Sequence, residues 1–210
     1  ARGLAPEVAI SVYTALAVLG AYSHTGFDLL GAILARLEGL LGQVGSPVLR
    51  IEALLAMGAA AYGMGEPAPM LDVVRALRAL AGQEGHAAYA LMADRLESSA
   101  RHFHGEHDAA QALCHRVLAA PVPAAAFSVS CPTPSPVGAR WNLARIAWIR
   151  GKADLAARLA HEALAYAEQR HGLALCQTLV VAALPVAIWR GDGAHAAQLA
   201  ARLTALGQAG

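Results

Sequence analysis

A glycine-centred turn recurs along this chain at an interval of about 40 residues, and this repeat most strongly limits the possible folds. The turn glycines are Gly65, Gly105, Gly151 and Gly191, and a fainter copy centres on Gly26. An apolar segment precedes each glycine, and a short polar turn and another apolar segment follow it. Glycine suits the position just after a helix, where left-handed backbone geometry costs it little. The pattern therefore predicts repeated pairs of helices.

The register of this repeat holds at two further positions. The residue five positions after each glycine is mostly small, and the residue eight positions after it is always apolar. A small residue lets two helices approach closely, and the apolar residue fills the space beside it. The first set is Gly31, Met70, Ala110, Ala156 and Ala196, and the second set is Leu34, Val73, Leu113, Leu159 and Leu199.

Helix starts and turns together predict five helix pairs. Serine followed by proline marks a helix start, and Ser-Pro-Val occurs at Ser46 and again at Ser135. No segment shows the alternation typical of a strand. The pairs are expected at residues 6–42, 47–82, 86–120, 136–170 and 173–206, with a Pro-rich extended connector at 121–135. We therefore predict one all-α domain, a TPR-like α-α superhelix with a concave face.

Pro185 interrupts the last long apolar segment. A proline inside a helix lacks the N–H that would bond to the carbonyl four residues earlier, here that of Val181. We expect a kink at this point of the helix.

The charge balance gives no reason to expect a nucleic-acid partner. Charged residues make up 15% of the chain, the formal net charge is +1, and no run of basic residues occurs. The mean hydropathy is +0.43, and two long apolar runs cover residues 8–22 and 173–189. Both runs are shorter than the roughly 20 residues of a membrane span, so we expect fully buried helices and no membrane partner.

The cysteines and the first residues bear on the compartment. Cys114, Cys131 and Cys176 are odd in number and irregularly spaced, which favours a reducing, cytoplasmic compartment over a disulfide framework. No signal peptide is visible. Because the chain starts Ala-Arg-Gly without methionine, we expect it to be part of a longer protein.

A cluster of histidines in the third turn raises the question of a metal site. His102, His104 and His107 lie within the stretch RHFHGEHDAA, and Cys114 and His115 follow. His102 and His104 should point to different sides of a helix, whereas His104 and His107 could converge across the turn with His115. The equivalent turns contain no histidine, so we expect no metal site. Metal binding or hydrolysis through His102, His104, His107 and Cys114 stays an alternative.

Motifs of common catalytic chemistry are missing from the sequence. Gly151-Lys152 lacks the other residues of a P-loop, and there is no dinucleotide-binding or nucleophile-elbow motif. The few carboxylates are dispersed, so no acid/base pair can be named. We therefore predict a protein that is not an enzyme and uses no cofactor.

The residues with the strongest claim to bind a ligand lie in the last two units. Trp141 and Trp148 are seven residues apart and so lie on one helix face. They are either core residues or an aromatic wall of a groove. Arg140 and Arg145 flank Trp141, and arginines on a concave face bind anions or peptides. Gln177, in an otherwise apolar helix, is a further candidate. We predict a site of Arg140, Trp141, Arg145 and Gln177, or a structural role for all four.

Two motifs in the last units carry a resemblance to a known family. They are ARIAWIRGKADLA (Ala144–Ala156) and LALCQTLVVAALPVAIWRGD (Leu173–Asp192). Ser135–Leu203 resembles the C-terminal tetratricopeptide-like region of large bacterial signal-transduction ATPase regulators, similar to the maltose-regulon activator class. The connector before it reads AFSVSCPTPS and departs from the aromatic-Gln-aromatic-Asp pattern of that family.

The resemblance implies a sensor or scaffold part of a bacterial transcriptional regulator, without catalytic residues. In such regulators a winged-helix DNA-binding domain and an ATPase domain precede the repeats, and neither is present in these residues. The expected partners are other domains of the same regulator, another protein or a second copy of the chain. The alternative is a sensor that binds a small-molecule effector in the groove of the superhelix.

Overall fold

The protein is all-α. The structure is a computed structural model that describes residues 4–22, 26–84, 87–121, 128, 130–170 and 172–209. No β-strand occurs among these residues, and Ser128 and Cys131 form one isolated bridge. The elements are α1 (Pro6–Tyr22), α2 (Phe27–Leu41), α3 (Pro47–Met64), α4 (Pro67–Glu84), α5 (Ala87–Phe103), α6 (His107–Ala119), α7 (Ser135–Ile149), α8 (Ala153–Glu168), α9 (Gly172–Thr178), η1 (Leu179–Ala183), α10 (Leu184–Trp189) and α11 (Gly193–Ala209).

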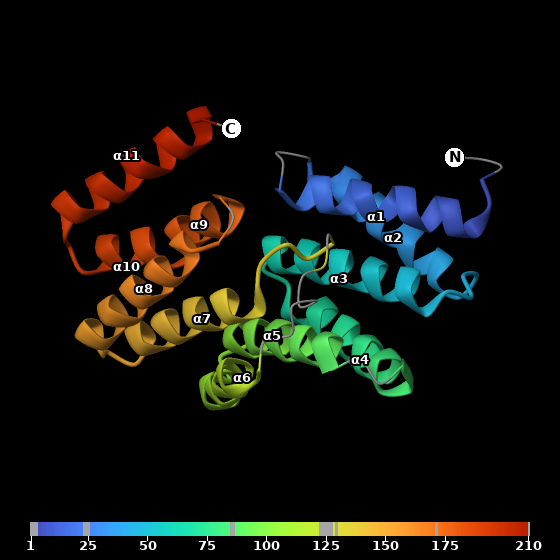
Figure 1. Ribbon diagram of the computed structural model, residues 1–210, viewed down its shortest axis with the longest axis horizontal. Coiled ribbons are helices and arrows are strands. Elements are labelled where there is room, and N and C mark those ends of the chain that lie inside the picture. Colours follow the sequence, from blue (N-terminus) through green and yellow to red (C-terminus); the bar gives the residue numbers. More distant parts are fainter. Residues whose placement is uncertain are drawn as a thin grey trace.

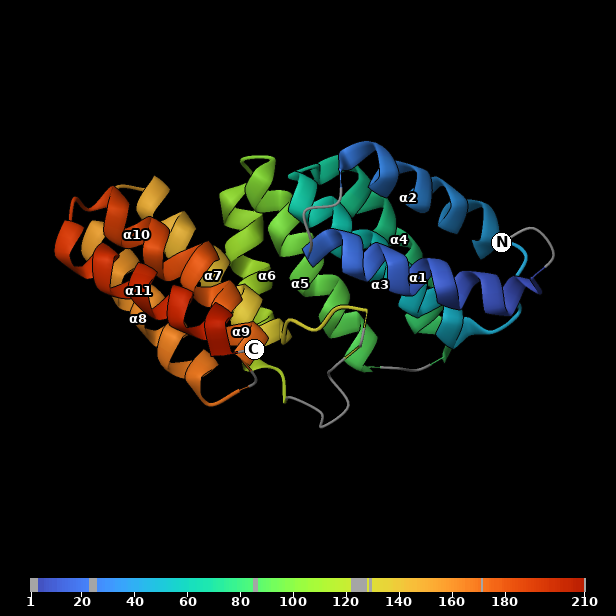
Figure 2. The same cartoon turned by 90° about the horizontal axis from the view of Figure 1, so that it is seen from above.

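The helices form the predicted antiparallel pairs, with ends within a few residues of the expected positions. Figure 1 shows the pairs following one another along an arc, from α1 and α2 to α11. The segments α9, η1 and α10 together form the first helix of the last pair. First helices of neighbouring pairs pack on one another, so α1, α3, α5 and α7 lie side by side along the molecule (Figure 2). The predicted helical-repeat superhelix is confirmed.

Four of the five turn glycines have the predicted left-handed backbone. Gly65, Gly105, Gly151 and Gly191 have φ angles of 72°, 86°, 71° and 73°. After α3, the N–H of Glu66 bonds back to the carbonyl of Ala61, and this pattern repeats at the other three turns. Gly26 differs, because its φ of −59° places it before α2 as an N-cap residue.

The two Ser-Pro-Val motifs both start helices, but only one serine caps. Ser46 accepts a hydrogen bond from the N–H of Leu49, as an N-cap residue should. Ser135 is already the first residue of α7, and its buried hydroxyl has no partner among the described residues. The connector before it is described only at Pro121, Ser128 and residues 130–134, so most of its predicted extended course lies outside the described residues.

A π-helical turn lies just before Pro185, in the helix where the sequence predicts a kink. The N–H of Leu184 bonds to the carbonyl of Leu179, five residues earlier, and η1 therefore joins α9 to α10. Pro185 lies in the first turn of α10, where its missing N–H is tolerated. Such π turns frequently occur at functional sites.

Both long apolar runs are only partly buried, so the expectation of full burial is wrong. On α1, Val8, Val12, Leu16 and Leu19 are exposed, because among the described elements α1 packs against α2 and α3 alone. The helix Gly172–Trp189 is long and apolar enough to cross a membrane by length and composition. It packs against α7, α8 and α11, as a core helix of a helical array does.

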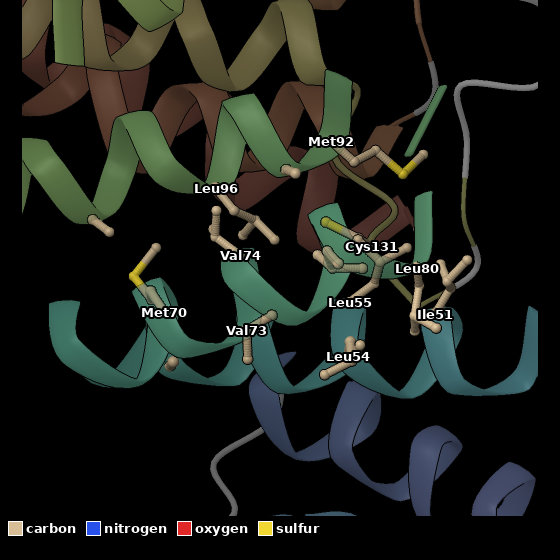
Figure 3. Close-up of a cluster of buried hydrophobic side chains, with 14 residues drawn as sticks. Ile51, Leu54, Leu55, Met70, Val73, Val74, Leu80, Met92, Leu96 and Cys131 are labelled. Carbon is tan, nitrogen blue, oxygen red and sulfur yellow. The ribbon is translucent and has the colours of Figure 1, made fainter. Parts of the chain in front are cut away.

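The largest core cluster joins α3, α4 and α5. Leu55, Met70 and Leu96 are fully buried in it (Figure 3), and so is Leu77. Leu96 of α5 reaches α3 and lies against Gly58, where a Cβ atom would be 2.9 Å from its Cδ1. The cluster therefore binds the second pair to the third.

Gly58 and Gly39 make a matched pair of helix glycines. A Cβ at Gly58 would also lie 3.3 Å from Val73 Cγ1, whereas a Cβ at Gly39 meets nothing within 4 Å. We expect Gly39→Ala to raise the free energy of unfolding by about 0.5–1 kcal/mol, because alanine is the better helix former. We expect Gly58→Ala to lower it by about 1 kcal/mol, because overpacking outweighs this gain. Urea unfolding of both variants checks the pair, and a gain at Gly58 contradicts the packing.

Candidate functional site

A cavity of about 570 Å³ lies on the concave side of the array. It is bordered by α1, α3, α5, α7, α9 and η1, so residues far apart in the sequence meet there. Ligand cavities are typically about 300–1,000 Å³ and mostly apolar. A second hollow, between α8 and the last pair, measures about 190 Å³ and is below that range. The large cavity is lined by Ala21, Ala59, Tyr62, Gly63, Arg95, Thr133, Trp141, Cys176, Gln177, Val180 and Val181.

Trp141 forms part of the cavity wall and is also a core residue. Its side chain is buried, and its indole Nε1 donates a 2.8 Å hydrogen bond to Thr178 Oγ1. The hydroxyl of Thr178 donates in turn to the carbonyl of Ala174, at 2.7 Å. These two bonds fix the ring of Trp141 against α9, so Trp141 is a core residue that also lines the cavity.

Gln177 is the second predicted residue that reaches the cavity. Thr133 Oγ1 donates a 2.7 Å hydrogen bond to Gln177 Oε1, which ties the connector to α9. No protein hydrogen bond from the amide nitrogen of Gln177 occurs within the described ranges. That nitrogen is therefore a donor available to a bound molecule.

Arg140 and Arg145 do not line the cavity. The guanidinium carbon of Arg140 lies 4.1 Å from the centre of the Tyr166 ring, and Nη1 donates to the carbonyl of Pro136 at 3.0 Å. Burial lowers the pKa of Arg140 below its ordinary value. The guanidinium carbon of Arg145 lies 6.0 Å from the centre of the Phe103 ring. The structure thus divides the predicted set into two cavity residues and two residues packed elsewhere.

Arg95 is the cavity residue that the sequence analysis missed. It is 4% exposed, and its Nη2 donates to the Cys131 thiol. Its Nε is buried without a hydrogen-bond partner, and no ion pair in the described part of the chain includes it. Among the described residues that line the cavity, it is the one charged side chain.

A buried polar seam beside Arg95 holds α5 against α7. Asn142 Nδ2 donates to Ser98 Oγ at 2.9 Å and to Ser99 Oγ at 3.0 Å. Arg95, Ser98, Ser99 and His102 follow one another at helical spacing, and all four are buried. Polar residues spaced by three and four on a helix expected in the core are the signal that could have located this site.

Two of the turn histidines, His102 and His107, lie against each other. The Nδ1 atoms of His102 and His107 are 3.4 Å apart, because the turn at Gly105 folds α6 back on α5. His104 is exposed, and its Nε2 lies 4.0 Å from Glu106 Oε1. His115 contacts Gln111 instead. In the described part of the chain, no three histidine, cysteine or acidic side chains gather where they could hold a metal ion.

Burial also decides the protonation state of two titratable groups near the polar seam. It lowers the pKa of His102 to about 4, with Arg145 and then His107 adding to the shift. Burial raises the pKa of the Cys114 thiol to about 11, against the opposing effect of hydrogen bonds with Ser98 and Asn142. At neutral pH, His102 is uncharged and Cys114 is a thiol, which is a poor nucleophile and metal ligand.

Trp148 lies outside the cavity. Its ring stacks on that of Trp189 in α10, with centroids 5.8 Å apart and an interplanar angle of 26°. Trp141 and Trp148 thus share the helix face turned toward the last pair, as their spacing predicted, but only Trp141 reaches the cavity.

No protein-family model matches this sequence, and no curated protein matches it either.

Proposed function

We propose that this chain is a non-catalytic regulatory repeat domain whose central cavity binds a small organic effector. The observation that carries the proposal is the cavity of about 570 Å³, in which apolar and aromatic walls surround a few polar groups. This combination is typical of small-molecule sites.

The position of the cavity favours a sensor over a simple carrier. The cavity walls come from helices of all five pairs, from Ala21 in α1 to Val181 in η1. A molecule that touches all these helices favours the curvature of the array in which its contacts are best. A ligand shifts a conformational equilibrium by its difference in affinity for the two states.

The larger protein is proposed to be a bacterial transcriptional regulator, and the compartment the cytoplasm. The resemblance of Ser135–Leu203 to the repeat region of signal-transduction ATPase regulators supports this part of the proposal. The array then passes the change in curvature to the other domains of the same regulator.

Thermal unfolding against a panel of metabolites, with zinc included, tests effector binding. A ligand at about 100 times its Kd adds roughly 2.7 kcal/mol to the stability of the folded state. For a domain of this size, the midpoint rises by roughly 5–10 °C. A flat panel, or a rise with zinc alone, contradicts the proposal.

Gly63→Phe supplies the matched control for that panel. Gly63 borders the cavity, and a Cβ there meets only the carbonyl oxygen of Ala21, at 3.8 Å, so a phenylalanine ring can enter the cavity. We expect Gly63→Phe to abolish the rise in the midpoint and Gly39→Phe, on the exposed face of α2, to preserve it.

A protein-binding scaffold is the second candidate function. The exposed stripe on α1, formed by Val8, Val12, Leu16 and Leu19, favours it, because apolar side chains aligned on one helix face suit a protein contact. Sedimentation of the protein and of Leu16→Lys tests self-association through this stripe. If the protein is monomeric at all concentrations, the stripe does not bind a second copy of the chain. A scaffold would then have to bind a different protein there.

A further inference from the structure

We propose that the central cavity is a carboxylate site, in which the guanidinium of Arg95 pairs with a small monoanionic molecule that has an apolar body. This inference rests on the proposed function, because it names the chemical class of the effector.

Arg95 is buried, and no acidic side chain pairs with it among the described residues. Asp94, next to it in the sequence, pairs outward with Arg78 and Arg116 at 2.6 and 2.7 Å, and Glu52 binds Ser128 at 2.6 Å. Among the described residues, the Cys131 thiol is the one hydrogen-bond partner of the Arg95 side chain, and sulfur is a weak acceptor. A buried charge is costly unless it is paired and hydrogen-bonded, so the cavity is incomplete without an anion.

The side chain of Arg95 packs closely against Gly138 of α7. A Cβ atom at Gly138 of α7 would lie 2.7 Å from Arg95 Cδ and 3.3 Å from its Cγ. The stem of the arginine therefore occupies the space that a side chain at Gly138 would need. Packing against Gly138 therefore holds the arginine stem in the wall of the cavity.

The remaining walls favour an apolar body with a single negative charge. Tyr62 and Trp141 contribute aromatic rings, and Val180 and Val181 contribute aliphatic surface. With one positive charge among the described lining residues, a monocarboxylate balances the cavity, whereas a phosphate dianion leaves one charge unpaired. A planar guanidinium and a planar carboxylate also match in geometry.

Matched acids and amides test the charge directly. Octanoate, phenylacetate and cinnamate are titrated calorimetrically into the protein, and so are their three neutral amides and inorganic phosphate. We expect at least one acid to bind about tenfold or more tightly than its amide. We expect Arg95→Gln to remove that preference, and Arg145→Gln, a partly buried arginine outside the cavity, to preserve it.

The thiol of Cys176 provides a second readout, because it lines the same cavity and is partly exposed. Iodoacetate is an anion and iodoacetamide is its neutral analogue, so the ratio of their reaction rates at Cys176 reports the local charge. We expect Arg95→Gln to lower this ratio by about threefold, because the positive charge that attracts iodoacetate is lost.

The outcomes separate this inference from the proposed function. The carboxylate site is overturned if the amides bind as tightly as the acids, or if phosphate competes equally with octanoate. In both cases the proposal of effector binding is unaffected. A failure of all three acids together with an unchanged alkylation ratio in Arg95→Gln also overturns it. A lower ratio in Arg95→Gln supports the anion site even where none of the three acids fits the cavity.

Discussion

Replacing Leu96 with alanine lowers the free energy of unfolding by about 3–5 kcal/mol. Leu96 is fully buried, and its side chain contacts the α3 and α4 residues of the cluster in Figure 3. Truncation removes apolar contacts and leaves a hole between two neighbouring pairs. In a helical array, stability depends on the interfaces between neighbours, so the loss affects the whole chain.

Leu19→Ala is the matched control for Leu96→Ala. Leu19 is 65% exposed on α1, and we expect its truncation to change the free energy of unfolding by less than about 0.5 kcal/mol. Urea unfolding at neutral pH measures both variants. Equal losses at the two positions would contradict the packing of α3, α4 and α5.

Lowering the pH from 7 to 4 reduces the stability of the protein by up to about 3 kcal/mol through His102 alone. The pKa of His102 is about 4 in the folded chain, against an ordinary value of 6.5. Well above pH 6.5 the imidazole is neutral in the folded and the unfolded chain, so His102 does not reduce the free energy of unfolding. Between pH 6.5 and 4, His102 binds a proton in the unfolded chain but stays largely neutral in the folded chain, so the free energy of unfolding falls.

The pH dependence of urea unfolding, compared between the protein and His102→Leu, isolates this contribution. We expect the leucine variant to lose less stability between pH 6.5 and 4, and we expect His104→Gln, at an exposed position of the same turn, to behave like the parent. A variant of His102 with the same pH profile as the parent would show that the imidazole is not buried in solution.

Most of the fold was predictable because its determinants are local. The glycines after α3, α5, α7 and α10 need left-handed geometry, and residue type alone identifies such positions. The π turn of η1 was not predictable in this way, because proline indicates only where an α-helical bond is lost. The partial exposure of α1 depends on which helices surround it, and apolar composition does not contain that information.

The cavity was only half predictable. Trp141 and Gln177 stood out because their types contrast with their surroundings in the sequence. Arg95 did not, because it lies next to Asp94 in a segment rich in charge. Its burial arises from contacts with Gly138 and Cys131, which are 43 and 36 residues away in the sequence. Long-range contacts of this kind cannot be derived from spacing within one helix.

The fluorescence of Trp141 tests the central claim, an effector in the cavity, most directly. Trp148 and Trp189 stack on each other outside the cavity, so Trp148→Phe together with Trp189→Phe leaves Trp141 as the only tryptophan. We predict that every compound that raises the midpoint of unfolding also changes the Trp141 emission saturably, and that Gly63→Phe abolishes both effects. Compounds that stabilise the protein but leave this emission unchanged, and that bind Gly63→Phe equally well, would contradict the claim.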